Sequence, residues 1–243
     1  MKKWYTPGGQ KYNGYVDMLA QPHLLIAGST GSGKSVLING LIHTALLQPP
    51  TTTQFILLDP KMVELDKFKK LPHCMGYADD LEGITWQLRV CVAMMQERYK
   101  TMKAKGLVQC DKPHIYIIID EYADLVTKAQ KVAIDCIIEL SRLGRAANLH
   151  LILATQSPSR QVISAPIKAN MTSRVALRCE EAIESRQIIN QTGAELLPNY
   201  GYGIYRTPTY RDPVKLPIPM TDPAELAARV LWWTKQNKKW FWH

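Results

Sequence analysis

The stretch HLLIAGSTGSGKSVLINGLI, residues 23–42, decides the fold. It runs from a short apolar segment through a loop rich in glycine and serine into a second apolar segment. Within it, Gly28, Gly33, Lys34 and Ser35 form the pattern G-x-x-x-x-G-K-S. Such glycines let successive backbone N–H groups turn toward a phosphate, and the helix that opens after the loop adds its positive end. The stretch therefore predicts a phosphate-binding loop between a buried strand and an amphipathic helix.

This loop predicts a site for ATP and Mg²⁺. We expect Lys34 to reach the β- and γ-phosphate oxygens and the Ser35 hydroxyl to ligate the metal. The rest of the loop would wrap the phosphates with its backbone. These residues are Gly28, Ser29, Thr30, Gly31, Ser32 and Gly33.

Further apolar runs predict a layered α/β fold. Short segments rich in Ile, Leu and Val, without alternation, are typical of strands buried on both faces of a parallel sheet; they are 23–28, 54–59, 115–120, 149–156 and 173–179. Apolar residues spaced three or four apart predict helices in 81–102 and 132–143. We expect an extension over 1–21, the main domain over 22–207, and a proline-rich connection with a last helix over 208–243.

Two polar strand ends add candidate catalytic groups. Asp120 closes the run IYIIID, and Glu121 follows it. The first carboxylate could hold the Mg²⁺ shell and the second could polarise the attacking water, which favours hydrolysis over phosphate transfer to a metabolite. Gln156 ends another predicted strand, and the carboxyl ends of parallel strands line one crevice. Its amide could contact the γ-phosphate, although a structural amide is an equal alternative.

Composition points to a basic globular protein. The 243 residues include 46% hydrophobic and 21% charged residues, and the net charge of +9 indicates an anionic partner, with nucleic acid the first candidate. The five cysteines are scattered, which favours a reducing compartment. No apolar run reaches the length of a membrane span. We expect a cytoplasmic chain with no transmembrane segment.

Several segments in this order resemble the motor domain of the FtsK/SpoIIIE family of double-stranded DNA translocases, from about residue 22 to residue 205. They are PHLLIAGSTGSGKS, LLDPKMVEL, ERYKTM, IIIDEYADL, RAANLHLILATQ, VISAPIKAN and ESRQII. The resemblance implies a RecA-like P-loop NTPase with a mainly parallel central sheet flanked by helices. It also implies a hexameric ring of identical subunits, with ATP between neighbours and duplex DNA in the central channel.

The resemblance also assigns roles to individual residues. It makes Asp120 the magnesium-shell acid, Glu121 the catalytic base and Gln156 the γ-phosphate sensor. Arg145 matches the arginine finger that is presented to a neighbour's ATP, and Arg142, one helical turn earlier, is the second choice.

The DNA contacts are expected in a basic segment. Residues 157–174 carry Arg160, Lys168 and Arg174 without an acidic residue, and Arg186 is a further candidate. The sequence departs from the family where it usually has an arginine, a lysine and an acid. The residues there are Ser157, Ala182 and Tyr202, respectively. Fewer phosphate contacts would mean a shallower salt dependence.

Other interpretations stay open. A protein-secretion ATPase of the same superfamily and a nucleotide-switched scaffold that delivers DNA are the alternatives to a DNA pump. We expect no membrane-spanning or winged-helix region, which suits DNA transfer or partitioning of a mobile element, or an excised motor domain. Lys61 and Glu64 follow a predicted strand end and lie either near the nucleotide or in an ordinary turn. The tail LWWTKQNKKWFWH is expected to pack on its own domain, with docking to a neighbouring subunit, to DNA or to a membrane surface as the alternatives.

Overall fold

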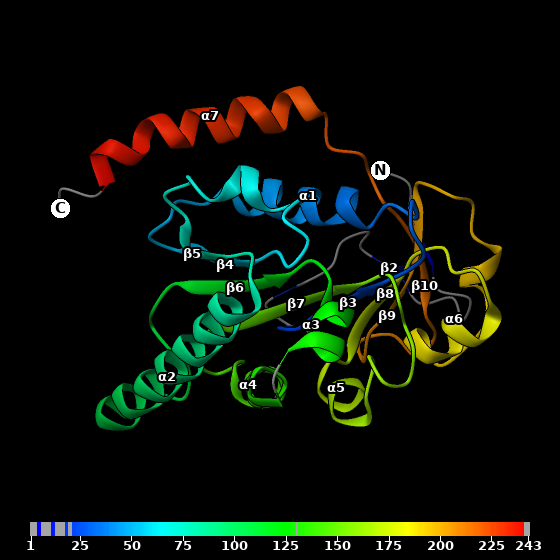
Figure 1. The fold of residues 1–243 in the computed structure, drawn as a ribbon, viewed down its shortest axis with the longest axis horizontal. Coiled ribbons are helices and arrows are strands. Elements are labelled where there is room, and N and C mark those ends of the chain that lie inside the picture. Colours follow the sequence, from blue (N-terminus) through cyan, green and yellow to red (C-terminus); the bar gives the residue numbers. More distant parts are fainter. Residues whose placement is uncertain (1–3, 6–10, 13–17, 19–20, 130, 241–243) are drawn as a thin grey trace.

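The computed structural model describes residues 4–5, 11–12, 18, 21–129 and 131–240. An eight-stranded sheet in the order β10-β9-β8-β3-β7-β6-β4-β5 forms the centre (Figure 1). A separate small sheet pairs β1 (Trp4–Tyr5) with β2 (Lys11–Tyr12). The strands of the main sheet are β3 (Leu24–Ala27), β4 (Thr53–Leu58), β5 (Cys74–Ala78), β6 (His114–Ile119), β7 (Leu149–Thr155), β8 (Ser173–Ala176), β9 (Tyr202–Arg206) and β10 (Val214–Pro217).

The sheet is mainly parallel, as predicted. The six strands from β8 to β5 pair in parallel, whereas β9 is antiparallel to both β8 and β10. Ala27 at the end of β3 pairs with Thr155 at the end of β7. The residues that follow the parallel strands therefore meet along one edge of the sheet.

Helices cover both faces of the sheet. In Figure 1, α1 (Lys34–Ala45) and α7 (Pro223–Trp240) lie above the sheet. Below it lie α2 (Leu81–Lys105), α3 (Tyr122–Lys128), α4 (Lys131–Leu143) and α5 (Ala165–Asn170). Helix α6 (Ala182–Ile189) lies beside the β8–β9 end. Two short 3₁₀ turns complete the described elements, η1 (Asp66–Phe68) and η2 (Ala194–Leu196).

The central strands are buried on both faces, which explains their lack of polar alternation. In β3, Leu25 and Ala27 belong to the core between the sheet and helices α2 and α4. Leu24 and Ile26 belong to the core between the sheet and helices α1 and α7. All four side chains are 0% exposed. A strand between two helical layers has no solvent face to mark with polar residues.

The predicted strands and helices are confirmed, but the sequence reading missed elements at the sheet edges. Strand β5 has a half-exposed pattern without a β-branched run. Strand β10 lies in the segment expected to be an irregular connection, where it pairs with β9, so the main sheet continues to Pro217 rather than stopping at residue 207. Proline is tolerated there because β10 is an edge strand and needs fewer ladder hydrogen bonds.

The C-terminal helix packs on its own domain, as expected. The Trp233 indole Nε1 donates to the Leu46 carbonyl at 3.0 Å, and its ring meets the His73 ring edge-on at 4.6 Å. Trp232 is 53% exposed. Residues 241–243 of the tail lie outside the described residues. Across the described parts of the chain, no helix is both long and apolar enough to span a bilayer.

Candidate nucleotide-binding and catalytic site

The loop between β3 and α1 has the backbone shape that its glycines predict. Gly31 and Gly33 adopt positive φ angles of 75° and 98°, which residues with a side chain rarely do. A Cβ on Gly28 would lie 2.7 Å from the Leu177 Cβ. Helix α1 then begins at Lys34, directly after the left-handed Gly33. Glycine is therefore required at these positions for the loop to turn tightly into the helix.

The amino end of α1 fits a phosphate group. Its cap residue is Gly33, which has no side chain that could occupy the helix end, and its first turn contains no acidic residue. The Ser32 hydroxyl is buried without a hydrogen-bond partner. A helix amino terminus with available donors is a favourable site for an anion. Ser29 differs from its neighbours because its N–H and its hydroxyl both donate to the Arg178 carbonyl, at 2.9 and 3.0 Å, so it anchors the loop.

Lys34 lies against the two acids at the end of β6. Its Nζ donates to the Asp120 carbonyl oxygen at 2.7 Å and lies 3.3 Å from the Asp120 Oδ1 and 3.6 Å from the Glu121 Oε2. Both acids are 2% exposed. Burial raises the pKa of Asp120 although Lys34 opposes the shift, and the nearby Asp59 and Glu64 raise it further. One cation thus neutralises part of a buried acidic cluster.

Both oxygens of the Glu121 carboxylate accept hydrogen bonds. The Thr155 hydroxyl donates to Oε1 at 2.8 Å, and the Gln156 backbone N–H donates to the same atom at 3.1 Å. The Lys61 Nζ donates to Oε2 at 3.1 Å. Burial raises the pKa of Glu121, but Lys34 and these donors outweigh it, so its pKa lies below the usual value. An ionised, oriented carboxylate is what a general base requires.

Gln156 connects the phosphate loop with the acid pair. The Thr30 hydroxyl donates to the Gln156 side-chain oxygen at 2.9 Å, while the Gln156 backbone N–H contacts Glu121. The structure therefore brings Gln156 to the site, as the strand-end argument predicted. Its sensor role stays a prediction.

The loop after β4 adds groups that the sequence left open or missed. The Ser35 hydroxyl donates to the Glu64 Oε1 at 2.6 Å, and Lys61 reaches Glu121.

Thr155 was not singled out from the sequence, although it is the last residue of the strand that precedes Gln156. Its position beside the acid depends on β6 and β7 being neighbours.

The donor atoms at this edge fit a magnesium ion. Mg²⁺ takes oxygen ligands in proteins, and Ser35, Asp120 and Glu64 supply hydroxyl and carboxylate oxygens here. The Asp120 Oδ1 is buried and accepts no hydrogen bond. Ser35 and Asp120 would hold the ion.

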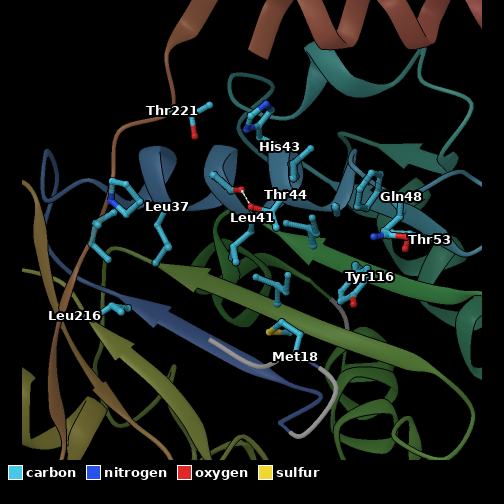
Figure 2. Close-up of a pocket in the computed structure, with 18 of the residues that line it drawn as sticks. Met18, Leu37, Leu41, His43, Thr44, Gln48, Thr53, Tyr116, Leu216 and Thr221 are labelled. Carbon is cyan, nitrogen blue, oxygen red and sulfur yellow. Dashed lines mark hydrogen bonds between the residues drawn. The ribbon is translucent and has the colours of Figure 1, made fainter. Parts of the chain in front are cut away.

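A separate cavity of about 670 Å³ lies between α1 and the sheet. Figure 2 shows Leu41, Tyr116 and Met18 around it, and its lining contains no residue of the phosphate loop or the acid pair. The Thr44 hydroxyl in its wall donates to the Gly40 carbonyl at 2.8 Å. The catalytic groups therefore gather at the edge of the sheet and not in this cavity.

Arg145 lies at the amino ends of the parallel strands, whereas Lys34 lies at their carboxyl ends. It occupies the turn between α4 and β7, before the amino end of β7, and is exposed. It is close enough to His23, which directly precedes β3, to contribute to the lowered pKa of that imidazole, where burial is the larger cause. Arg142, near the end of α4, is also exposed. Neither arginine lies beside the phosphate loop of its own chain.

Three of the four cationic DNA candidates share one hollow. Arg160, Lys168 and Arg186 line a depression of about 780 Å³ that also includes Gln156. Although the sequence segment 157–174 has no acid, the fold brings glutamates from the start of α6 into the same hollow: Glu180, Glu181 and Glu184. The hollow is therefore mixed in charge.

Arg174 does not join this surface. It is 6% exposed, and its guanidinium donates to the carbonyl oxygens of Met171 at 2.7 Å, Ile188 at 3.2 Å and Lys168. Its donors are used to hold β8, α5 and α6 together, so this arrangement does not favour the expected DNA contact of Arg174, which stays a prediction.

Residues 8–114 and 108–160 match the FtsK/SpoIIIE family. The chain belongs to this family. The DNA translocase FtsK of Lactococcus lactis subsp. cremoris is 37% identical over 234 residues, which cover 86% of this chain and 31% of the relative. The DNA translocase FtsK of Streptococcus pneumoniae is 38% identical over 234 residues, which cover 86% of this chain and 30% of the relative. The chain thus spans about a third of the length of these curated relatives.

Solved structures show the same fold. The pCW3 conjugation coupling protein TcpA, in its monomer form with ATPγS, superposes with a TM-score of 0.79 at 22% identity, covering 95% of this chain and 69% of TcpA. The cytoplasmic domain of the type VII secretion ATPase EccC of Thermomonospora curvata gives 0.75 at 22% identity, covering 97% of this chain and 30% of EccC. The chain is a P-loop ATPase domain with the RecA-like fold that the resemblance implied.

Positions where this FtsK/SpoIIIE domain departs from the family pattern now have a structural setting. Ser157 is exposed and lines the same hollow as Arg160. Ala182 begins α6 at the rim of the same region. Tyr202 lies in β9 with the Lys215 Nζ 4.3 Å from its ring centroid. Cations at or near the first two positions, as the resemblance implies for the family, would lie at the mixed hollow or its rim.

Proposed function

We propose that this FtsK/SpoIIIE domain hydrolyses ATP with Mg²⁺ and uses the energy to move double-stranded DNA, as a ring of identical subunits. One observation carries the proposal: Lys34 of the phosphate loop lies 3.6 Å from Glu121, in a buried cluster where Glu121 is held by donors on both oxygens. A basic phosphate contact after β3 and an ionised base after β6, with only β7 between the two strands, are what water attack on a phosphate requires.

Each residue has a defined part in this reaction. Lys34 binds the β- and γ-phosphates, together with the loop backbone and the buried Ser32 hydroxyl. Mg²⁺, held by Ser35 and Asp120, would supply neutralisation of phosphate charge. Glu121 accepts the proton of the attacking water. Gln156, hydrogen-bonded to the phosphate loop, responds to the γ-phosphate.

The position of Arg145 supports a multi-subunit site. Because it lies at the other end of the parallel strands from Lys34, it is suited to contact the nucleotide of a neighbouring copy rather than its own. A cation supplied in this way stabilises the charge of the transition state. We therefore propose a homo-oligomer, with six subunits as in the ring that the resemblance implies, working in the cytoplasm.

Arg160, Lys168 and Arg186 are the proposed contacts to the DNA backbone. Their hollow shares Gln156 with the nucleotide site, which gives a short physical connection between nucleotide state and grip on DNA. Contacts to phosphates carry no sequence information, so movement is independent of sequence. Three glutamates in the same hollow weaken the field, and we expect a moderate affinity with a moderate salt dependence.

A triplex-displacement assay tests the proposal, with ATPase activity measured in parallel. Duplex DNA should stimulate ATP hydrolysis in a salt-sensitive way, and ATP should drive displacement of the third strand. Lys34→Ala, which removes the phosphate contact, is the matched negative control. Displacement in the absence of ATP, or ATP turnover indifferent to duplex DNA, would contradict a DNA pump.

Two other functions have specific support and separate outcomes. The similarity in fold to EccC favours a motor acting on a polypeptide, and in that case DNA would leave the ATPase rate unchanged. The similarity in fold to TcpA favours a coupling protein that delivers DNA, and in that case DNA would bind without third-strand displacement. The proposed cellular setting of DNA pumping is transfer or partitioning of a mobile DNA element.

A further inference from the structure

The loop after β4, residues 59–65, contacts two different parts of the nucleotide site at once. Its sequence is DPKMVEL. Lys61 reaches the base Glu121, and Glu64 reaches Ser35 in the first turn of α1. In the reaction as described so far, Lys61 is only one of the donors to Glu121, and Glu64 has no part.

The shape of this loop is set from within. The Asp59 Oδ2 accepts the backbone N–H groups of Glu64 at 3.0 Å and of Leu65 at 2.9 Å. Asp59 and Leu65 are both 0% exposed, so the turn is anchored in the core. Met62 within the turn has a positive φ of 59°. A closed turn of this kind presents Lys61 and Glu64 in fixed directions, because a buried aspartate bonded to two backbone donors resists reorganisation.

Lys61 orients the oxygen of Glu121 that Thr155 does not hold. Its Nζ lies 3.1 Å from the Oε2 of Glu121, whereas the Nζ of Lys34 lies 3.6 Å from that atom and donates to the Asp120 carbonyl. A hydrogen bond between an ammonium and a carboxylate is about twice as strong as a neutral one. Lys61 is also partly exposed, with 37% of its side chain accessible against 3% for Glu121. It therefore holds the carboxylate from the solvent side.

Glu64 orients a residue of α1, as Lys61 orients the residue that follows the end of β6. Its Oε1 accepts the Ser35 hydroxyl at 2.6 Å. Since Ser35 lies in the first turn of α1 and Glu121 follows β6, the loop connects the phosphate-binding helix with the acid strand. A displacement of the whole loop would therefore affect both contacts.

We infer that Lys61 is a positioning residue for ATP hydrolysis, and that the loop anchored by Asp59 orients Glu121 and Ser35 jointly, an inference that rests on the proposed ATPase function. Lys61 acts through Glu121, and Glu64 acts through Ser35. Neither forms a bond with the reacting phosphate.

The central test is steady-state ATP hydrolysis by Lys61→Met. The loss of an orienting partner should lower kcat about tenfold or more and leave KM for ATP nearly unchanged, because the phosphate loop is intact. Lys61→Arg should restore most of kcat, since a guanidinium also donates to a carboxylate. Lys67→Met is the matched control, because Lys67 is exposed in the same region with its Nζ 5.2 Å from the Phe68 ring centroid.

A second variant pair shows whether Lys61 acts through Glu121. In single-turnover measurements, adding Lys61→Met to Glu121→Gln should cause no further loss, because the group that Lys61 orients is already removed. A loss that multiplies in the double variant would overturn the inference. Equal kcat for Lys61→Met and wild type, or a loss that Lys61→Arg does not restore, would overturn it as well.

A binding measurement tests the Glu64 arm without relying on activity. A fluorescent ATP analogue should bind Glu64→Ala, which removes the acceptor for Ser35, about tenfold more weakly with Mg²⁺ present and equally well without it. Weakening that is the same in both conditions would count against joint orientation. If wild type and Lys67→Met do not hydrolyse ATP, the proposed function itself fails. If both hydrolyse ATP and Lys61→Met matches them, only the present inference fails.

Discussion

Lys34 and Arg145 lie at opposite ends of the parallel strands of one sheet. Lys34 begins the helix that follows the carboxyl end of β3, whereas Arg145 precedes the amino end of the neighbouring strand β7. A single chain therefore presents a phosphate-binding end and a free arginine on separate surfaces. Copies stacked head to tail in a ring would bring the two together, because a heterologous interface joins different surfaces of identical subunits.

Arg145→Ala should lower the ATPase rate by roughly 10³-fold or more if it acts as the finger. Mixing Arg145→Ala with Lys34→Ala should restore part of the activity, because a Lys34→Ala subunit still offers Arg145 to an intact phosphate loop next to it. Arg142→Ala is the matched control and should remain active. Full activity of Arg145→Ala on its own would remove the residue as the finger.

Lys34 and Glu121 should separate binding from hydrolysis. Lys34→Ala removes the cation that contacts the phosphates and should abolish ATP binding. Glu121→Gln keeps the shape of the side chain but not its basicity, so it should bind ATP and stall. Equilibrium binding of a fluorescent ATP analogue and single-turnover hydrolysis measure the two steps. Normal turnover by Glu121→Gln would show that another group is the base.

Arg160 and Arg186 should govern the grip on DNA without affecting basal ATP hydrolysis. Each substitution to alanine should weaken duplex binding uniformly across sequences and reduce the slope of log K against log[salt] by about 0.9. Fluorescence anisotropy at a series of salt concentrations measures this slope. An unchanged slope in the double variant would exclude these residues as phosphate contacts.

Arg174→Ala should act on stability instead. Removing a buried guanidinium that donates to three carbonyl oxygens leaves those acceptors unsatisfied and should cost about 3 kcal/mol of unfolding free energy. For a domain of this size that corresponds to a fall in Tm of roughly 6–12 °C. Arg160→Ala, which changes an exposed residue of the same segment, should leave Tm almost unchanged. Calorimetry on both variants makes the comparison.

Acid should destabilise the domain through its buried histidines. Burial is the largest cause that lowers the pKa of His23 to about 4 and that of His150 to about 3, and the His150 Nε2 lies 2.8 Å from the His114 Nδ1. The unfolded chain binds protons near pH 6.5, where the folded chain does not. Stability is therefore full above about pH 6.5 and is lost progressively as the pH falls toward 4.

The histidine effect is measured as Tm at about pH 7.5 and about pH 5.5. Each buried histidine contributes on the order of 1 kcal/mol to the loss at the lower pH. His150→Gln, which cannot be protonated, should lose less Tm between the two conditions than wild type. An identical pH dependence in wild type and variant would mean that His150 does not contribute.

Much of the nucleotide site could be predicted from the sequence because its parts are local. The glycines of the phosphate loop, the acid pair after β6 and Gln156 after β7 each stand at the end of a recognisable apolar strand. Since parallel strands end at one edge, these groups had to approach one another once the strands were assigned. Helices α2 and α4 could likewise be predicted from the spacing of their apolar residues.

The missed features depend on which elements become neighbours. The Thr155–Glu121 hydrogen bond requires β6 beside β7, and the burial of Arg174 requires α5 and α6 to close around β8. Strand β10 was hidden because its proline content resembles a connection, while its pairing with β9 is set by the chain returning to the edge of the sheet.

The amino-acid sequence by itself determined a P-loop ATPase domain of the FtsK/SpoIIIE family, since its motifs are short segments whose residues act with their own backbone. Only the tertiary structure decided that Lys61 meets Glu121, that Arg145 faces away from its own phosphate loop, and that glutamates share the basic hollow. Such contacts join residues far apart in the chain, and strand order and loop closure, which no local periodicity encodes, bring them together.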